Sequence, residues 1–209
     1  MQKGPMFYLK RIFNTMILVM LFAGVLAAQT KTEDPFKVKS TYIISFIKYL
    51  EWDNKDILPE NDSPIIIGIL ADENEDTEKY LDLFNQFAEI INNKPTMLER
   101  LTKNHKLEIK HFTSLAEVIP CHILFITSQK LLTNSDASKQ EDVLRSLQEK
   151  LNGYPTLLVG DFENFAQKMG GHVNFTLNQG RVEFIINLDA VKKSGIQVRA
   201  SLLQAAQKG

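Results

Sequence analysis

Short apolar runs alternate with stretches of helical periodicity along most of the chain. Three segments are predominantly apolar, which is typical of strands covered on both faces of a sheet: residues 65–71, 121–127 and 155–159. Residues 106–112 instead alternate between apolar and polar positions, as a half-buried strand does. Helical spacing of apolar residues occupies residues 35–52, 80–91 and 139–151. This order of elements predicts a mostly parallel sheet with helices packed against it.

The first predicted helix has a defined start and one apolar face. Asp34 is suited to the N-cap, and Pro35 is suited to the first helical position, where its missing N–H is not needed. Four apolar residues share the face that we expect the sheet to cover: Ile43, Phe46, Ile47 and Leu50. Trp52 is predicted to end this helix, and Gly153 to stop the helix over 139–151.

Residues 154–188 are predicted to complete the sheet with an antiparallel hairpin. Each strand has one apolar side, formed by Val173, Phe175 and Leu177 and by Val182, Phe184, Ile186 and Leu188. Leu177 and Val182 can share the core side only across a loop with an even number of residues. Either Gln179 and Gly180 or residues 178–181 therefore form the turn. Gly170 and Gly171 precede the hairpin, where a tight turn with positive φ needs glycine.

Together these elements predict an α/β, three-layer fold. A mostly parallel sheet of about six strands carries helices on both faces and ends in a C-terminal antiparallel hairpin near an edge. Residues 114–119 predict one short helix between two strands. Residues 189–207 predict two short helices, or one helix broken at Gly195.

The first 28 residues have the composition of a cleaved secretory signal peptide. Lys3, Lys10 and Arg11 precede an apolar stretch over residues 12–26, and small residues up to Ala28 lead to an abrupt polar change. An uncleaved anchor is the alternative, although the apolar stretch is short for a spanning helix. Cleavage leaves residues 29–209, a length that suits one exported domain without a membrane span.

Charge and cysteine content limit the function classes. Residues 1–28 hold three of the 24 Lys and Arg residues and none of the 25 Asp and Glu residues, so the mature chain has a net charge of −4. This charge provides no electrostatic footprint for nucleic acid. Cys121 is the only cysteine, which makes an intramolecular disulfide impossible. A buried, inert thiol and an intermolecular disulfide both remain open for it.

The sequence offers no recognisable catalytic or metal-binding motif. Its four histidines form no HExxH or comparable ligand set, and the G-x-S-x-G nucleophile motif is absent. We therefore predict a protein that is not an enzyme and has no metal or cofactor. The acidic loop over residues 72–78 precedes a predicted helix, so we interpret it as a solvated helix start rather than a ligand site.

Two sets of polar residues are candidates for binding. The hairpin side opposite the apolar one carries His172, Asn174, Thr176, Arg181, Glu183 and Asn187, and is either a solvated face or a partner- or ligand-binding surface. The binding candidates chosen from it are Asn174, Arg181, Glu183 and Asn187, while Gly170, Gly171 and Gly180 are assigned to structural turns. The second set follows the carboxyl ends of the parallel strands, where open α/β sheets bind small ligands: Asp72, Ser128 and Asp161.

The order of several motifs resembles that of the YfiR/HmsC-like family of exported regulatory proteins. The resemblance runs from about Phe36 to Ala206 and includes KSTYIISFIKYLEW, IIIGILA, CHILFI, TLLVGD, NFAQKMGGHVNF, RVEFIINL and SGIQVRASLLQAA. Eight residues match the family's pattern in the C-terminal part: Gly170, Gly171, Asn174, Phe175, Arg181, Phe184, Ile186 and Asn187.

The resemblance implies a non-enzymatic periplasmic regulator of membrane signalling. Such a protein binds the periplasmic sensor region of a membrane-bound diguanylate cyclase and represses it, which lowers cyclic di-GMP and biofilm formation. The alternative is a small-ligand-binding sensor component of a histidine-kinase system. Some members respond to redox state through paired cysteines, a control that Cys121 alone does not allow. A homodimer is a further expectation, because sheet edges and helix faces can be self-complementary.

Overall fold

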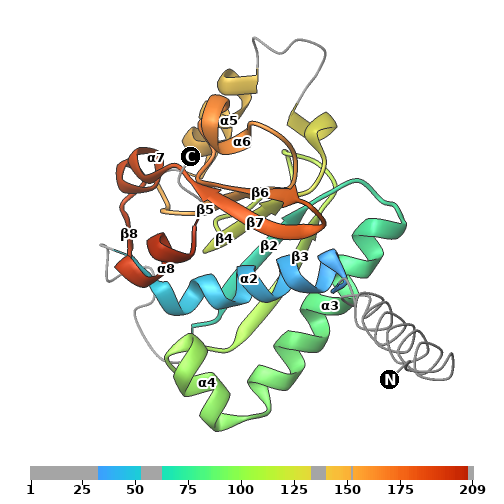
Figure 1. The fold of residues 1–209 in the computed structure, drawn as a ribbon, viewed down its shortest axis with the longest axis vertical. Coiled ribbons are helices and arrows are strands. Elements are labelled where there is room, and N and C mark those ends of the chain that lie inside the picture. Colours follow the sequence, from blue (N-terminus) through green and yellow to red (C-terminus); the bar gives the residue numbers. More distant parts are fainter. Residues whose placement is uncertain (1–32, 53–62, 133–139, 152, 207–209) are drawn as a thin grey trace, which may run out of the picture. The chain divides into compact units, whose positions relative to one another are not determined.

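Six strands form the main sheet, in the order β3-β2-β4-β5-β6-β7 (Figure 1). They are β2 (Ile65–Leu70), β3 (Leu107–Phe112), β4 (Ile123–Ile126), β5 (Leu157–Gly160), β6 (Val173–Asn178) and β7 (Arg181–Ile186). The strands from β3 to β6 run parallel, and β7 pairs antiparallel with β6 at the edge. The computed structural model describes residues 33–52, 63–132, 140–151 and 153–206, so the predicted signal peptide lies outside the described residues.

Helices cover both faces of this sheet, as the sequence predicts. The helices that do so are α2 (Pro35–Tyr49), α3 (Glu75–Asn92), α5 (Gln140–Lys150) and α6 (Phe165–Lys168). On one face, Phe46 of α2 and Phe84 of α3 join Phe125 of β4 in a large apolar core. On the other, Leu144 of α5 and Phe165 of α6 belong to a smaller core. The three-layer α/β prediction is confirmed, because each face of the sheet has its own helical cover.

The first helix starts where the sequence predicts. Asp34 caps α2, since its Oδ1 accepts a hydrogen bond from the backbone N–H of Phe36 at 3.0 Å. The predicted apolar face is buried throughout: Ile43, Phe46, Ile47 and Leu50. Burial of this face against the sheet stabilises the helix more than its intrinsic propensity does.

The predicted end of this helix is wrong. The helix stops at Tyr49, and Leu50–Trp52 form the short strand β1. β1 pairs antiparallel with β8 (Ile196–Val198) in a separate two-stranded sheet. The C-terminal region therefore supplies backbone hydrogen bonds that replace the next helical turn, and helical periodicity alone does not reveal such a partner.

Two further elements differ from the predictions. α4 (Pro95–Thr102) is absent from them, although Pro95 occupies the first helical turn, where proline is favoured. Residues 114–119 form turns rather than the predicted short helix, with backbone hydrogen bonds from Glu117 to Ser114 and from Val118 to Leu115. A short segment followed by proline does not sustain a helix, because nucleation is costly and the residue before proline disfavours helical torsions.

The hairpin has the two-residue loop that parity allows. Asn178 pairs with Arg181, so Gln179 and Gly180 form the turn, with φ of 50° and 78°. Two successive positive φ values are typical of the tight turns whose twist matches antiparallel strands. The prediction for Leu177 is wrong, since it lies on the apolar side but beyond the core and is 61% exposed.

The C-terminal tail contains the two predicted short helices. They are α7 (Leu188–Lys193) and α8 (Ala200–Ala205), and Gly195, with φ of 75°, lies between them. Leu188 begins α7 instead of extending β7, and the strand β8 between the two helices is an addition to the prediction.

Candidate functional site

A cleft of about 920 Å³ lies at the carboxyl ends of the parallel strands. Asp72 follows β2, Ser128 follows β4 and Asp161 follows β5, and all three line the cleft. The first turns of α2 and α3 and the exposed Leu177 contribute to its walls. The structure thus brings together the three residues of the predicted crevice, because parallel strands deliver their carboxyl ends to the same edge of a sheet.

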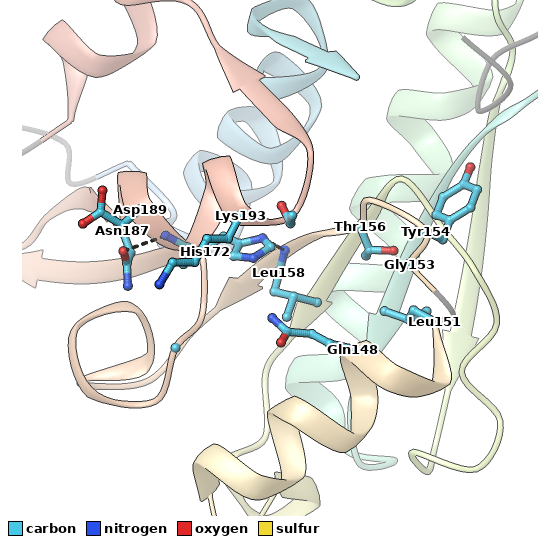
Figure 2. A pocket seen from close by; sticks show the side chains of 13 residues that line it. Gln148, Leu151, Gly153, Tyr154, Thr156, Leu158, His172, Asn187, Asp189 and Lys193 are labelled. Carbon is cyan, nitrogen blue, oxygen red and sulfur yellow. Dashed lines mark hydrogen bonds between the residues drawn. The ribbon is translucent and has the colours of Figure 1, made fainter. Parts of the chain in front are cut away.

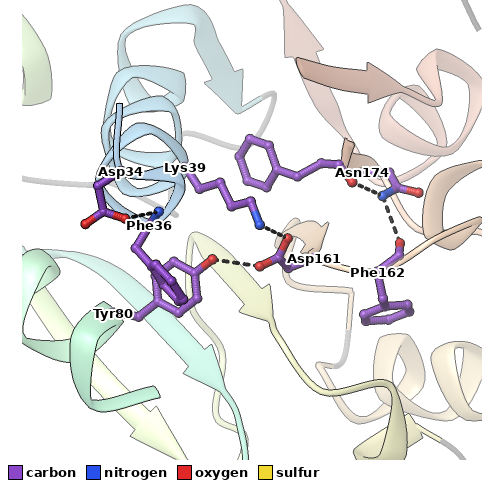
Figure 3. A network of polar contacts seen from close by, with 8 residues as sticks. Asp34, Phe36, Lys39, Tyr80, Asp161, Phe162 and Asn174 are labelled. Carbon is purple, nitrogen blue, oxygen red and sulfur yellow. Dashed lines mark hydrogen bonds and ion pairs between the residues drawn. The ribbon is translucent and has the colours of Figure 1, made fainter. Parts of the chain in front are cut away.

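A network of polar contacts joins this cleft to α2 and α3 (Figure 3). Oδ1 of Asp161 lies 2.5 Å from the ammonium of Lys39, and Oδ2 accepts a hydrogen bond from the hydroxyl of Tyr80 at 2.7 Å. The side chains of Lys39 and Asp161 are only 12% and 15% exposed. Burial, and then the charge of Asp161, raises the pKa of Tyr80 well above its ordinary value. The phenol therefore stays protonated and acts as a donor.

A second set of contacts shapes the acidic side of the cleft. Ser128 Oγ donates to Asp72 Oδ2 at 2.6 Å, and Thr77 Oγ1 donates to the Asp72 carbonyl oxygen at 2.6 Å. Asn74 caps α3 by accepting from the backbone N–H of Thr77 at 2.9 Å, so the acidic loop is a helix start. Four carboxylates and two ammonium groups line the cleft: Asp72, Glu75, Asp76, Asp161, Lys39 and Lys130. Its lining is therefore acidic on balance.

The structure separates the four binding candidates of the hairpin. Asn174 is fully buried, and its Nδ2 donates to the carbonyl oxygens of Phe162 and Phe175 at 2.8 and 2.7 Å. Asn187 caps α7 through its Oδ1 and donates from Nδ2 to the Ala166 carbonyl oxygen at 2.8 Å. Both amides thus connect backbone segments. The interpretation of this hairpin side as solvated is wrong for two residues, Asn174 and His172, because both are buried and His172 is only 1% exposed.

Arg181 and Glu183 lie on β7, the edge strand of the sheet. Arg181 is exposed next to the turn, whereas Glu183 is half-buried. Leu177 is exposed at the same end of the hairpin, because it pairs with Val182 one position from Arg181. Arg181 and Leu177, which we call the hairpin tip, are therefore both accessible at this end of the hairpin, although they project from its opposite sides.

The three glycines assigned to turns have different roles. Gly170 and Gly180 have φ of 81° and 78°, as a turn assignment requires. Gly171, in contrast, does not have a positive φ. A Cβ atom at Gly171 would instead overlap the ring of Phe165, so this glycine permits close approach of the ring to the backbone.

Catalytic chemistry has no visible support in the described part of the chain. No cluster of three or more His, Cys, Asp or Glu side chains there could hold a metal ion. Cys121 is fully buried, and burial raises the pKa of its thiol to about 12. Such a thiol is almost entirely protonated at neutral pH and is therefore a poor nucleophile.

Sequence reasoning missed two residues of the cleft network, Lys39 and Tyr80. Lys39 lies off the apolar stripe of its helix, and a lysine there suggests solvent exposure. Tyr80 lies on the apolar stripe of α3 and suggests simple packing. A tyrosine on a buried stripe does carry one usable signal, since its hydroxyl needs a hydrogen-bond partner. The partner itself, Asp161, lies 81 residues away and is visible only in the fold.

Fold and site define a class of protein: an α/β domain with an acidic cleft at one end of its sheet and buried polar contacts that hold the chain together. Among the described helices, none has the length and apolarity to cross a membrane. Residues 36–207 match the model of the YfiR/HmsC-like family, and the chain belongs to this family of periplasmic regulators, which are not known as enzymes. None of the curated proteins compared with the chain matches it.

Proposed function

We propose that this protein is a periplasmic repressor that binds the periplasmic sensor region of a membrane signalling protein, most simply a diguanylate cyclase. The observation that carries the proposal is the family match, which spans nearly all of the described α/β unit. Export by the N-terminal signal peptide would place the protein where such a sensor region is accessible. The partner chemistry is therefore that of a protein surface rather than a substrate.

Repression follows from preferential binding to one conformation of the partner. A repressor that binds the inactive conformation about 10⁴-fold more tightly than the active one moves the partner from mostly active to mostly inactive. Cyclic di-GMP then falls, and release of the repressor restores synthesis. A homodimer fits this mechanism, because a twofold repressor can engage two copies of a dimeric sensor.

We assign the hairpin tip, Leu177 and Arg181, as the contact surface. Leu177 is the most exposed of the large apolar side chains among the described residues, and Arg181 is exposed at the same end of the hairpin, on its opposite side. Arginine is enriched at the residues that dominate interface energies, and an exposed leucine loses water-accessible apolar area on docking. Both side chains project from a tight hairpin, so their placement needs little ordering on binding.

Deletion and complementation test this proposal. Deleting the gene should raise cyclic di-GMP, and the wild-type gene should restore the low level. A Leu177→Asp, Arg181→Glu double variant should fail to restore it while folding normally. Ile90→Asp is the matched control, because Ile90 is also exposed, at 43%, but lies on α3. Unchanged cyclic di-GMP and unchanged output of neighbouring sensors after deletion would remove the basis of the proposal.

The cleft supports a second candidate function, a sensor component that binds a small ligand. Its volume is in the range of small-molecule sites, and Asp72 and Asp161 face it from strand ends. The acidic lining favours a cationic ligand. A thermal-shift screen with amines, amino acids, sugars and nucleotides would detect such a ligand as a concentration-dependent rise in Tm. A flat screen would exclude this function.

A further inference from the structure

Figure 2 shows a second pocket, of about 590 Å³. It lies at the amino ends of β5 and β6, whereas the acidic cleft lies at the carboxyl ends of the parallel strands. Tyr154, Thr156 and Leu158 line it from the start of β5, and His172 lines it just before β6. The end of α5, the start and body of α7, and the loop residues Gly153 and Gly170 supply the rest of its described walls. The pocket shares no lining residue with the cleft. Neither the family match nor the proposed repressor function assigns a role to this pocket.

The ring of His172 is held in one orientation and one tautomer. Its Nδ1 accepts a hydrogen bond from the backbone N–H of Leu158 at 3.0 Å, so the ring hydrogen is on Nε2. His172 is 1% exposed, and its Nε2 has no hydrogen-bond partner within the part of the chain that the structure describes. A buried donor without a partner destabilises the folded state, because it has lost its hydrogen bonds to water. Burial lowers the pKa of His172 to about 4, so the ring is neutral at physiological pH.

His122 also lies just before a parallel strand, and it shows how the fold pairs the second ring nitrogen of such a histidine. His122 precedes β4 and its Nδ1 accepts from the backbone N–H of Ile66 at 3.0 Å, as His172 does from Leu158. Nε2 of His122, however, lies 3.1 Å from the hydroxyl of Tyr154. The fold therefore pairs both ring nitrogens of His122, whereas Nε2 of His172 has no partner among the described residues.

The remaining groups of the pocket indicate what would satisfy this donor. Thr156, Ser194 and Asn187 already donate to the carbonyl oxygens of Cys121, Val191 and Ala166. Figure 2 shows Lys193 and Asp189 of α7 on one side of the His172 ring and Leu158 and Gln148 on the other. Lys193 adds a positive charge, Asp189 adds a negative one, and Leu151 and Leu158 supply apolar wall.

We propose that this pocket binds a small organic carboxylate with an apolar body. One carboxylate oxygen accepts the hydrogen bond from His172 Nε2–H, the Lys193 ammonium lies near the charge, and the apolar body contacts Leu151 and Leu158. Because Nε2 is closed to solvent in this conformation, we expect exposed side chains of the lining, such as that of Gln148, to shift when the ligand enters. The Asp189 carboxylate opposes a second negative charge, so monocarboxylates bind better than dicarboxylates.

Histidine-side-chain NMR tests the pocket on the isolated, folded protein. The probes are acetate, benzoate, phenylacetate and succinate, each added to protein with ¹⁵N-labelled histidines. We expect benzoate and phenylacetate to shift the Nε2 resonance of His172, which a His172→Asn variant identifies, and to leave those of His105 and His111 in place. Benzamide, the neutral analogue of benzoate, should bind at least about fivefold more weakly, since hydrogen bonds to charged groups are the stronger ones.

A pair of neighbouring lysines provides the control for charge. Lys193→Gln should weaken benzoate binding at least about fivefold, whereas Lys192→Gln, on the same helix but outside the pocket lining, should leave it unchanged. Both residues are exposed, so both variants should fold. The proposal is wrong if none of the four probes moves the His172 resonance, or if the two lysine variants weaken binding equally. Either result leaves the repressor proposal untouched, because that depends on cyclic di-GMP levels.

Discussion

At the scale of single residues, two glycines make room for one aromatic ring. A Cβ atom at Gly160, the last residue of β5, or at Gly171, just before β6, would overlap the ring of Phe165. Phe165 is fully buried in the smaller core. The ring therefore packs directly on the backbone of two neighbouring strands, an approach that any larger residue at either glycine would prevent.

We expect Gly171→Ala to lower the free energy of unfolding by about 1–3 kcal/mol, because the added methyl overpacks the core against Phe165. Urea unfolding measures the loss. In a Phe165→Leu background the same substitution should cost less, since the smaller side chain can give way. Equal losses in both backgrounds would show that the ring is not the cause.

His172 should make stability depend on pH. Its pKa is about 4 in the folded protein, below the ordinary value of a histidine, so the unfolded chain takes up the proton first. The contribution to stability is complete above about pH 6.5 and is lost as the pH falls towards 4, a change on the order of 3 kcal/mol. The other titratable side chains that line the same pocket are Asp189, Lys193 and Tyr154.

Urea unfolding between about pH 6.5 and pH 5 measures this effect above the titration of ordinary carboxylates. His172→Asn cannot titrate and keeps a side-chain acceptor for the Leu158 backbone N–H. The variant should therefore lose less stability than the wild type as the pH falls. Parallel pH profiles for the two proteins would rule out His172 as the source.

At the scale of elements, α2 is tied to the sheet by both its apolar face and one ion pair. Lys39 reaches from α2 to Asp161 at the end of β5, and Tyr80 reaches the same carboxylate from α3. Because Lys39 and Asp161 are largely shielded from water, the loss of one partner leaves a poorly solvated charge. The cleft network is therefore a structural link among three elements.

We expect Lys39→Met to lower the free energy of unfolding by about 2–4 kcal/mol, because Asp161 keeps only the Tyr80 hydrogen bond. Arg199→Met is the matched control. Arg199, which follows β8, pairs with Glu51 of β1 at 2.7 Å, but both side chains are about half exposed, so water screens the pair and its loss should change the stability little. Urea unfolding of both variants tests the difference, and equal losses would contradict the role of burial.

At the scale of the whole molecule, one sheet serves two cores. Side chains of β2, β4 and β5 alternate between the larger core under α2 and α3 and the smaller core under α5 and α6. Cys121 belongs to the smaller core and has no exposed surface. Neither a thiol reagent nor a second chain can reach it in this conformation, which favours the inert-thiol alternative over an intermolecular disulfide.

Cys121 should therefore report on opening of the whole fold. We expect an aromatic disulfide reagent to label it only as fast as the smaller core opens, and urea to accelerate labelling in step with global unfolding. Labelling in the native protein that is fast and independent of urea would show that the core opens locally. Non-reducing electrophoresis of native protein should show no disulfide-linked dimer.

Sequence patterns predicted the fold class because they report local choices. Buried parallel strands such as residues 65–70 are apolar throughout, and parity allowed Gln179 and Gly180 as the hairpin turn. The cleft residues Asp72, Ser128 and Asp161 followed from a topological rule, since each succeeds a parallel strand. In these cases the physical cause lies within a few residues of its effect.

The errors arise where the cause is distant in sequence. Leu50–Trp52 continue a helical pattern but pair with β8, nearly 150 residues later. Lys39 and Tyr80 are ordinary helix residues until the fold places both on Asp161. Asn174 and His172 alternate as exposed strand residues do, yet they are buried.

The sequence alone therefore determined the α/β class, the succession of the six main-sheet strands along the chain, the hairpin register and the resemblance to the family. Only the tertiary structure decided which polar groups are buried, which are paired, and where the two pockets lie. The physical reason is that burial and hydrogen bonding depend on neighbours brought together by folding, whereas periodicity and turn chemistry depend on the residues next in the chain.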